Sequence, residues 1–281
     1  MIPTLGRRHP MIRRLRALRR EPALRREQSV FLAEGLHLAQ EALRSHADVE
    51  LVVFSGRLSS SAEGRDLRRA IERRRLPCAE TADAVLDSLQ DARASQPILM
   101  LVNRPRHAPD AGLDASGTLP LVVVAAGIQD PGNLGGLLRT ADAAGATACC
   151  VTEGSADPYH PRAVRATMGS IYRVPLHVPS AEGLLPRLRA HGLRLIAADP
   201  TSGANFDRCD FTVPAAVLFG GEGAGLPDSL RNAADESVRV PLRHEVDSLS
   251  VGAAAAVLLF EAARQRRDGT SGLSPPICGD G

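Results

Sequence analysis

Five short apolar runs between residues 121 and 219 constrain the fold of this chain more than any other feature. Each run is four to six residues long, and stretches with helical periodicity separate them. Strands that are apolar along nearly their whole length are buried on both faces, which is typical of a parallel sheet covered by helices. The sequence therefore predicts a parallel α/β domain, which would bind ligands at the carboxyl ends of its strands. The runs are Leu121–Ala126, Ala148–Val151, Pro175–Val178, Leu193–Ala198 and Ala215–Phe219.

The first part of the chain predicts a second, smaller α/β domain, because strands and helices alternate there as well. Helices are expected over His9–Arg26, Leu36–Arg44, Ala62–Arg75 and Ala82–Leu89, and strands over Glu50–Phe54 and Pro97–Val102. Residues 107–119 combine Pro, Gly, Asp and Ser without periodicity, as a linker does. The predicted organisation is a domain over 1–106, a linker over 107–119, a second domain over 120–267 and a disordered tail over 268–281.

Charge is unevenly distributed between these parts, and every basic residue apart from histidine is arginine. Residues 1–106 contain 20 Arg against 13 Asp and Glu, a balance of +7, whereas residues 107–281 contain 14 Arg against 19 acids, a balance of −5. The first part is therefore expected to face a polyanion. The stretch Arg7–Arg26 suits contacts with phosphates, because guanidinium groups bind phosphate in a planar fork. A solvated amphipathic helix is the alternative interpretation.

The cysteines predict neither a disulfide framework nor a metal site. The five are scattered, with no CxxC pair and no Cys/His spacing that suits zinc. Such a set fits a reducing cytoplasm. We expect no membrane partner, because no run of about 18 apolar residues occurs and the arginine-rich start lacks the apolar core of a secretory signal. The cysteines are Cys78, Cys149, Cys150, Cys209 and Cys278.

Two segments beside predicted strands carry polar side chains together with glycines. In Asp130–Asp142 (DPGNLGGLLRTAD), Asn133 can cap the following helix, two glycines permit close approach of backbone, and Arg139 projects from the second helical turn. Leu218–Leu226 (LFGGEGAGL) has four glycines in six residues, which lets backbone wrap a ligand beside the Glu222 carboxylate. Taken singly, these segments are equally well explained as a capped helix and a tight turn.

A third segment, Val240–Ala262, contains an alanine-rich helix that Ser248 can cap. A terminal docking helix explains this pattern by itself. In order and spacing, however, the three segments together resemble the three motifs of the SpoU/TrmH family of SPOUT methyltransferases. The matching residues are Asp130–Ala141, Gly220–Leu226 and Val240–Ala254.

Two further segments extend the resemblance to roughly residues 8–265. His160–Leu176 (HPRAVRATMGSIYRVPL) is similar to the family segment between the first and second motifs. Phe31–Leu43 (FLAEGLHLAQEAL) is similar to part of the family's accessory substrate-binding domain, an α/β fold shared with small ribosomal RNA-binding proteins. The resemblance implies a C-terminal domain with a deep trefoil knot and a homodimer whose active site is shared across the interface.

The resemblance also implies an activity: methylation of a ribose 2′-hydroxyl in structured RNA with S-adenosylmethionine as cofactor. Ribosomal RNA, most of all 23S rRNA, is the preferred substrate and transfer RNA is the alternative. Arg139 would hydrogen-bond the 2′-oxygen, Asn133 and Glu222 would hold Arg139 and the ribose, and Ser248 would support the site. The implied cofactor contacts are Gly220, Gly221, Gly223, Val240, Leu249 and Ser250. The expected RNA contacts are Arg13, Arg14, Arg16, Arg19, Arg20 and Arg165.

Two departures from the family pattern keep other functions open. The third motif reads SLSV rather than SLNV, so Ser250 replaces an asparagine and loses an amide donor. His160 replaces another asparagine, and we assign it no catalytic role. An RNA-binding protein that has lost catalysis is therefore an alternative, and a resistance methylase acting on ribosomal RNA would share all the motifs. Aromatic residues make up only 3% of the chain, which favours folded RNA over stacked single strands.

Overall fold

The computed structural model describes residues 2–90, 95–114, 117–179, 181–243 and 249–269, which form two compact units. The first unit takes in two stretches that lie beyond residue 120 in the sequence. It consists of Met1–Ala108, Ile128–Arg139 and Ser155–Pro175. The second consists of Pro109–Gly127, Thr140–Gly154 and Leu176–Gly281.

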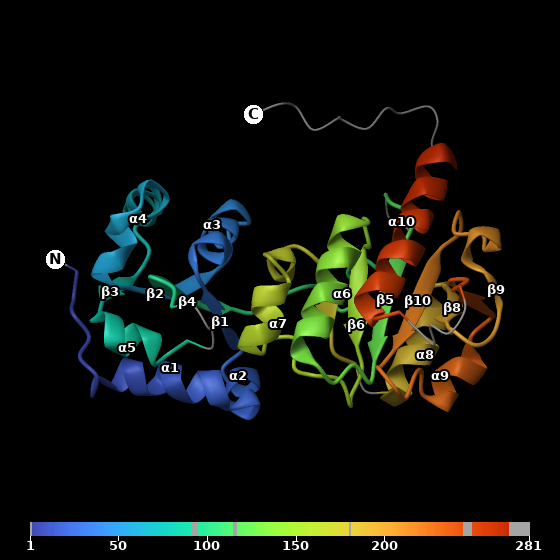
Figure 1. Ribbon diagram of the computed structural model, residues 1–281, viewed down its shortest axis with the longest axis horizontal. Coiled ribbons are helices and arrows are strands. Elements are labelled where there is room, and N and C mark those ends of the chain that lie inside the picture. Colours follow the sequence, from blue (N-terminus) through green and yellow to red (C-terminus); the bar gives the residue numbers. More distant parts are fainter. Residues whose placement is uncertain (1, 91–94, 115–116, 180, 244–248, 270–281) are drawn as a thin grey trace. The chain divides into compact units, whose positions relative to one another are not determined.

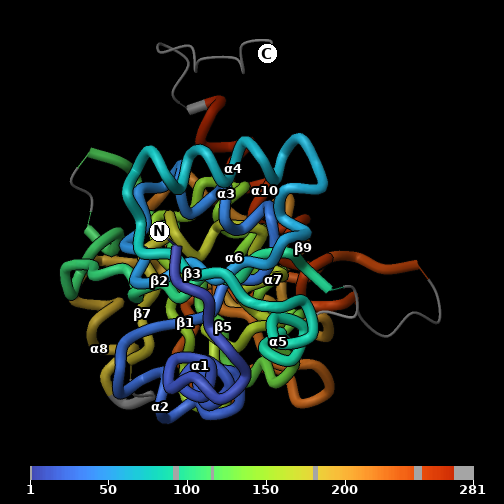
Figure 2. The backbone as a smooth tube through the Cα atoms, turned by 90° about the vertical axis from the view of Figure 1, so that its left-hand side faces the viewer, coloured from blue at the N-terminus to red at the C-terminus, as the bar shows by residue number. Residues whose placement is uncertain are grey.

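The first unit is built on a four-stranded sheet in the order β1-β4-β2-β3. Strand β4 is antiparallel to both β1 and β2, whereas β3 is parallel to β2. Helices α3 and α4 cover one face of this sheet, and α1, α2 and α5 lie on the other (Figure 1), as the view turned by 90° also shows (Figure 2). The strands are β1 (Val30–Glu34), β2 (Val49–Phe54), β3 (Cys78–Glu80) and β4 (Ile98–Asn103). The helices are α1 (Pro10–Arg20), α2 (Pro22–Glu27), α3 (Leu36–Arg44), the 3-10 turn η1 (Gly56–Ser60), α4 (Ala62–Arg73) and α5 (Asp83–Asp87).

The long helix predicted over His9–Arg26 is wrong, because the structure has two helices there. Pro22 has no N–H to donate and disfavours a helical conformation at the residue before it. Glu21 accordingly adopts φ −107° and ψ 101° and ends α1. Strands β1 and β3 were not predicted, and all five residues of β1 are buried although the last of them is Glu34.

Two helices from the middle of the sequence complete the first unit. The first half of α6 (Pro131–Ala143) approaches α7 (Pro161–Ala166) closely at Gly135, and α7 packs on β1. A Cβ atom on Gly135 would lie 2.3 Å from the carbonyl oxygen of Ala163, so only glycine allows this approach. The Phe31 ring on β1 lies 5.4 Å from that of Tyr159 and 5.8 Å from that of Tyr172, in the 3-10 turn η2 (Ser170–Tyr172). These contacts join the segment around α7 to the sheet.

The second unit is built on a seven-stranded sheet in the order β7-β6-β5-β10-β8-β11-β9. All its strand pairs are parallel, which confirms the predicted parallel α/β fold. Every residue of β5 and β6 is buried, as the continuous apolar runs required. The strands are β5 (Leu121–Ala126), β6 (Ala148–Val151), β7 (Leu176–His177), β8 (Arg194–Ala198), β9 (Ala204–Asn205), β10 (Ala215–Gly220) and β11 (Glu236–Arg239), of which β9 and β11 were not predicted.

Helices pack on this sheet and bury alternate strand residues. Leucines of α8 (Ala181–Ala190) and α9 (Asp228–Ala233) form one apolar cluster with β5, β8 and β10. The 3-10 turn η3 (Phe206–Arg208) precedes β10, and α10 (Val251–Gly269) packs against that strand. No helix in the described part of the chain combines the length and the hydropathy that crossing a bilayer requires.

Arg266 ties the end of α10 to the start of the sheet. Its guanidinium donates to the carbonyl oxygens of Leu119, Pro120, Phe211 and Val213 at 2.8–2.9 Å. Burial lowers the pKa of Arg266 to about 10, so the side chain remains charged at neutral pH. Hydrogen bonds from a charged donor are stronger than neutral ones, and this set holds the C-terminal helix in place.

Candidate cofactor pocket and active site

The second unit contains a pocket of about 530 Å³ at the carboxyl ends of β8, β10 and β11. The loops after these three strands and the first turns of α10 form its wall. The carboxyl ends of the strands are the edge at which open parallel sheets bind ligands. Its volume falls within the range of small-molecule sites.

The glycine-rich loop after β10 forms one wall because it folds back on itself. Gly221 and Gly225 exchange backbone hydrogen bonds of 3.2 and 2.9 Å. A Cβ on Gly220 would lie 2.2 Å from the carbonyl carbon of Gly225, so no other residue fits there. Gly223 and Gly225 have φ values of 84° and 68°, which glycine adopts readily. Three expected cofactor contacts (Gly220, Gly221 and Gly223) line the pocket.

The other three expected cofactor contacts also line the pocket: Val240, Leu249 and Ser250. Ser250 caps α10, because its Oγ accepts a 3.4 Å hydrogen bond from the N–H of Ala253 and the helix begins at Val251. The structure thus gives Ser250 the capping role that we predicted for Ser248. Ser248 itself lies outside the described residues.

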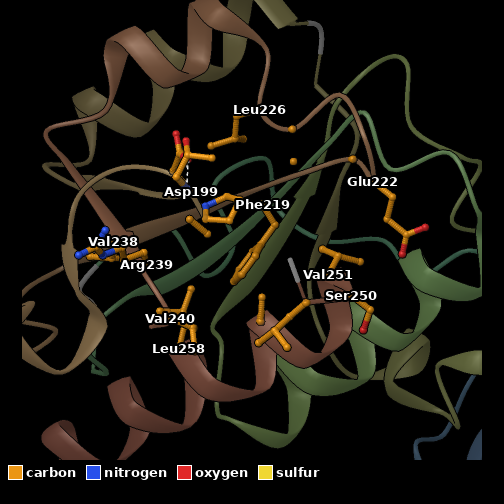
Figure 3. A pocket seen from close by; sticks show the side chains of 18 of the residues that line it. Asp199, Phe219, Glu222, Leu226, Val238, Arg239, Val240, Ser250, Val251 and Leu258 are labelled. Carbon is orange, nitrogen blue, oxygen red and sulfur yellow. Dashed lines mark hydrogen bonds between the residues drawn. The ribbon is translucent and has the colours of Figure 1, made fainter. Parts of the chain in front are cut away.

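Glu222 is exposed on the glycine loop and lines the same pocket. Figure 3 shows Glu222 and Ser250 on one side of the pocket and Asp199 and Arg239 on the other. The pocket therefore has polar groups at both ends, with the apolar side chains of Phe219, Val240 and Leu258 in its lining.

Asn133 and Arg139 lie on α6, in the first unit. Asp130 caps this helix, since its Oδ1 accepts a 3.0 Å hydrogen bond from the N–H of Asn133. That backbone hydrogen bond and the nearby Arg162 guanidinium lower the pKa of Asp130. The cap expected of Asn133 is therefore wrong, and Asn133 lies in the first turn of the helix. Arg139 is exposed.

Asp199 is a pocket residue that the sequence analysis did not single out. It is only 6% exposed, and its Oδ1 accepts hydrogen bonds from Thr201 N (2.8 Å) and Thr201 Oγ1 (2.7 Å). Nε of Arg231 lies 3.7 Å from its Oδ2. Burial raises the pKa of Asp199, but the hydrogen bonds from Thr201 and Ser202 outweigh burial, so the net pKa is lowered. The available signal was its place directly after an apolar strand of a parallel sheet.

Several arginines expected to bind RNA are engaged within the first unit. On α1, Arg14 pairs with Glu50 and also donates to Gln28, while Arg19 donates to the Gln90 carbonyl at 2.7 Å. Arg16 donates to Ser88 at 3.2 Å, Arg165 pairs with Glu34 at 3.1 Å, and Arg13 and Arg20 are exposed. Their contacts with RNA stay a prediction. Among the described residues, no cluster of His, Cys, Asp or Glu could hold a metal ion.

A parallel α/β unit with a glycine-lined pocket at its strand ends is typical of proteins that bind a small ligand at that edge of the sheet. The profile of the SpoU rRNA Methylase family matches residues 120–260, and the profile of the MRM3-like substrate binding domain matches residues 9–100. The chain belongs to the SpoU rRNA Methylase family.

Relatives and solved structures match over most of this chain. The 23S rRNA (guanosine(2553)-2′-O)-methyltransferase RlmP of Bacillus subtilis (strain 168) is 30% identical over 83% of this chain and 88% of its own length. The 23S rRNA (uridine(2479)-2′-O)-methyltransferase of Streptomyces viridochromogenes is 27% identical over 98% of this chain and 100% of its own. The crystal structure of the SpoU methyltransferase AviRb from the same species, in complex with the cofactor AdoMet, superposes with a TM-score of 0.82 at 27% identity, covering 92% of this chain and 99% of that one.

Proposed function

We propose that this chain is an S-adenosylmethionine-dependent methyltransferase that methylates a ribose 2′-hydroxyl of 23S ribosomal RNA. The glycine-lined pocket at the strand ends carries this proposal, because it provides a built ligand site in a chain of the SpoU rRNA Methylase family. The relatives that match over most of their length are named as 23S rRNA 2′-O-methyltransferases, which favours ribosomal over transfer RNA.

The pocket fits the cofactor in size and chemistry. Its volume of about 530 Å³ suits a ligand of this class. The side chains of Phe219 and Leu258 offer an apolar surface for an aromatic base, and the backbone of Gly220, Gly221 and Gly223 can approach the ligand closely. Val240, Leu249 and Ser250 complete the proposed contacts. When bound, the cofactor supplies a methyl group on a sulfonium, which is already a strong electrophile.

The protein's task is then to orient the ribose and stabilise developing charge. Arg139 is proposed as the catalytic group. A guanidinium keeps its proton in proteins and cannot serve as a general base, so this side chain donates hydrogen bonds to the 2′-oxygen as negative charge develops there. A neighbouring phosphate or water accepts the proton. Asn133 and Glu222 hold Arg139 and the ribose, and Ser248 supports the site.

We also propose that the protein is a homodimer whose interface includes α10. One face of this helix is buried within the second unit by Ala255, Leu258 and Ala262. On the opposite face, the first turns of the helix carry alanines and Phe260, which is 48% exposed. Exposed apolar surface of this kind marks an interaction site, and a second copy of the chain would cover it symmetrically.

The remaining features of the proposal follow from the family. Residues 1–106 would bind RNA, 107–119 would link, and 120–267 would form the catalytic domain, whose C-terminal segment threads a loop to make a deep trefoil knot. An enzyme acting on ribosomal RNA works in the cytoplasm, so we propose that location.

The deciding experiment is methyl transfer from radiolabelled S-adenosylmethionine to total RNA from a strain that lacks the gene. We expect label in 23S rRNA that digests to 2′-O-methyl nucleosides, and no label with the Arg139→Ala variant. Label on a base would refute ribose chemistry, and label on transfer RNA would refute the substrate. RNA binding without any transfer would favour the non-catalytic alternative and point to Ser250.

A further inference from the structure

Six arginines follow helix α3 in the first unit and are called the α3 track here. They come from three separate parts of the chain: the end of α3, the end of α4 and the segment around α7. Figures 1 and 2 show α3 and α4 together on the sheet face opposite α1. The track consists of Arg44, Arg74, Arg75, Arg162, Arg165 and Arg173.

Contacts at the C-terminal end of α3 bring the first members together. Arg74 donates a hydrogen bond to the carbonyl oxygen of Leu43, which places the end of α4 beside the end of α3. Glu41 accepts from both Arg44 (2.7 Å) and Arg173 (2.5 Å). One carboxylate therefore positions two arginines that are 129 residues apart in the sequence.

Contacts at the N-terminal end of α3 extend the track to the helix that carries the proposed catalytic residues. Nε2 of His37 lies 3.2 Å from the carbonyl oxygen of Met168, and Arg165 pairs with Glu34 at 3.1 Å. Arg162 pairs at 3.2 Å with Asp130, the residue that caps α6. The track thus begins at the N-terminus of α6 and ends beyond α3, which is itself about 13 Å long.

The arrangement leaves the guanidinium groups facing solvent. The side chains of Glu34 and Glu41 are only 1% and 11% exposed, whereas those of Arg165, Arg173 and Arg44 are 37%, 42% and 72% exposed. The buried carboxylates orient the arginines from beneath and neutralise only part of their charge. Six arginines face three carboxylates (Glu34, Glu41 and Asp130), so the track keeps a net positive charge.

We propose that the α3 track binds successive phosphates of the folded RNA substrate and directs the strand toward α6. The identity of the polyanion rests on the proposed function. Oriented guanidinium forks suit phosphate geometry, and such contacts give affinity and register rather than sequence specificity. The competing surface is α1, where Arg14 pairs with Glu50, a carboxylate that is 33% exposed rather than buried, and Arg16 and Arg19 donate to Ser88 and the Gln90 carbonyl.

The test compares three double variants of the full-length protein, with 23S rRNA transcribed in vitro as probe. Arg44→Gln/Arg75→Gln removes charge from the track, and Arg13→Gln/Arg20→Gln removes it from α1. Arg106→Gln/Arg208→Gln removes the same charge at two exposed positions outside both surfaces. Filter binding is measured between 0.1 and 0.4 M KCl, because each lost phosphate contact lowers the slope of log K against log salt by roughly 0.7–0.9.

For the track variant we expect about tenfold weaker binding at 0.1 M salt and a slope lower by about 1.5. We expect its KM for RNA to rise while kcat at saturating RNA is unchanged, and binding of the Arg106/Arg208 variant to stay within about twofold of wild type. Equal melting temperatures show that the variants fold. Wild-type affinity and slope in the track variant would overturn the proposal, as would an equal loss in the Arg106/Arg208 variant.

The same preparations separate failure of the track from failure of the proposed function. If the wild-type protein transfers no methyl group but the track variant alone loses salt-dependent RNA binding, the proposed activity fails and the track stands. If the wild-type protein methylates 23S rRNA and only the α1 variant binds weakly, the activity stands and the track is refuted.

Discussion

Ser250 lines the cofactor pocket and also caps α10, so one side chain serves both stability and the site. We expect Ser250→Ala to lower the free energy of unfolding by about 1 kcal/mol, because the N–H of Ala253 loses its acceptor. Ser250→Asn should keep wild-type stability, since asparagine caps helices as well as serine does, and should transfer methyl at no less than the wild-type rate. Urea unfolding and initial rates measure both. An unfolding free energy of Ser250→Ala equal to that of the wild type would show that the 3.4 Å capping hydrogen bond contributes nothing to stability.

Asp199 gives the pocket a titratable carboxylate whose folded-state pKa is lowered. A group with a depressed pKa stabilises the fold above its unfolded pKa, here about 3.9, and this contribution is lost as the pH falls through the folded value. We expect Asp199→Asn to cost about 1–2 kcal/mol of unfolding free energy at pH 7. The difference from wild type should be constant from pH 8 to 5 and shrink below about pH 4. A difference that grows on acidification contradicts this account.

At the scale of elements, the two adjacent glycines of α6 are expected to behave oppositely. A Cβ on Gly135 would lie 2.3 Å from the carbonyl oxygen of Ala163, whereas a Cβ on Gly136 would meet nothing within 4 Å. Gly135→Ala must therefore separate α6 from α7, and we expect a loss of about 2 kcal/mol or more, the range of overpacked cores. Gly136→Ala should be neutral or stabilise by up to about 1 kcal/mol through helix propensity. Thermal unfolding of both variants measures the difference. Equal stability of the two variants would show that Gly135 is not required for close packing of α6 on α7.

Element prediction from the sequence succeeded where one physical signal dominated. The apolar runs of β5 and β10, and the nearly continuous run of β8, predicted a parallel sheet because strands buried on both faces carry few polar residues. It failed where two signals competed: the apolar stripe continued past Pro22, although that proline ends α1. Strand β1 was missed because buried Glu34 reads as a surface residue, and its partner Arg165 is 131 positions away.

In the candidate site, too, some residues could be recognised from the sequence and others could not. The glycine loop was recognisable from composition, and the structure places it at the strand ends in the pocket wall. Asp199 was not recognisable, because its importance depends on burial beside Thr201 and Arg231 rather than on local sequence. Likewise, the arginine-rich α1 is conspicuous in the sequence, whereas the α3 track is assembled from three distant segments that only the fold brings together.

At the scale of the whole molecule, the exposed Phe260 ring on α10 determines the expected oligomeric state. We expect the wild-type protein to sediment at twice the 29.8 kDa chain mass, because Phe260 would otherwise leave 48% of its surface in water. Phe260→Glu buries a charge at the interface and should yield monomers that still bind S-adenosylmethionine. Val178, which is 58% exposed, provides the matched control, and Val178→Glu should remain dimeric. Analytical ultracentrifugation with isothermal titration of the cofactor gives both readouts. A wild-type monomer would refute the dimer, and a Phe260→Glu dimer would move the interface away from α10.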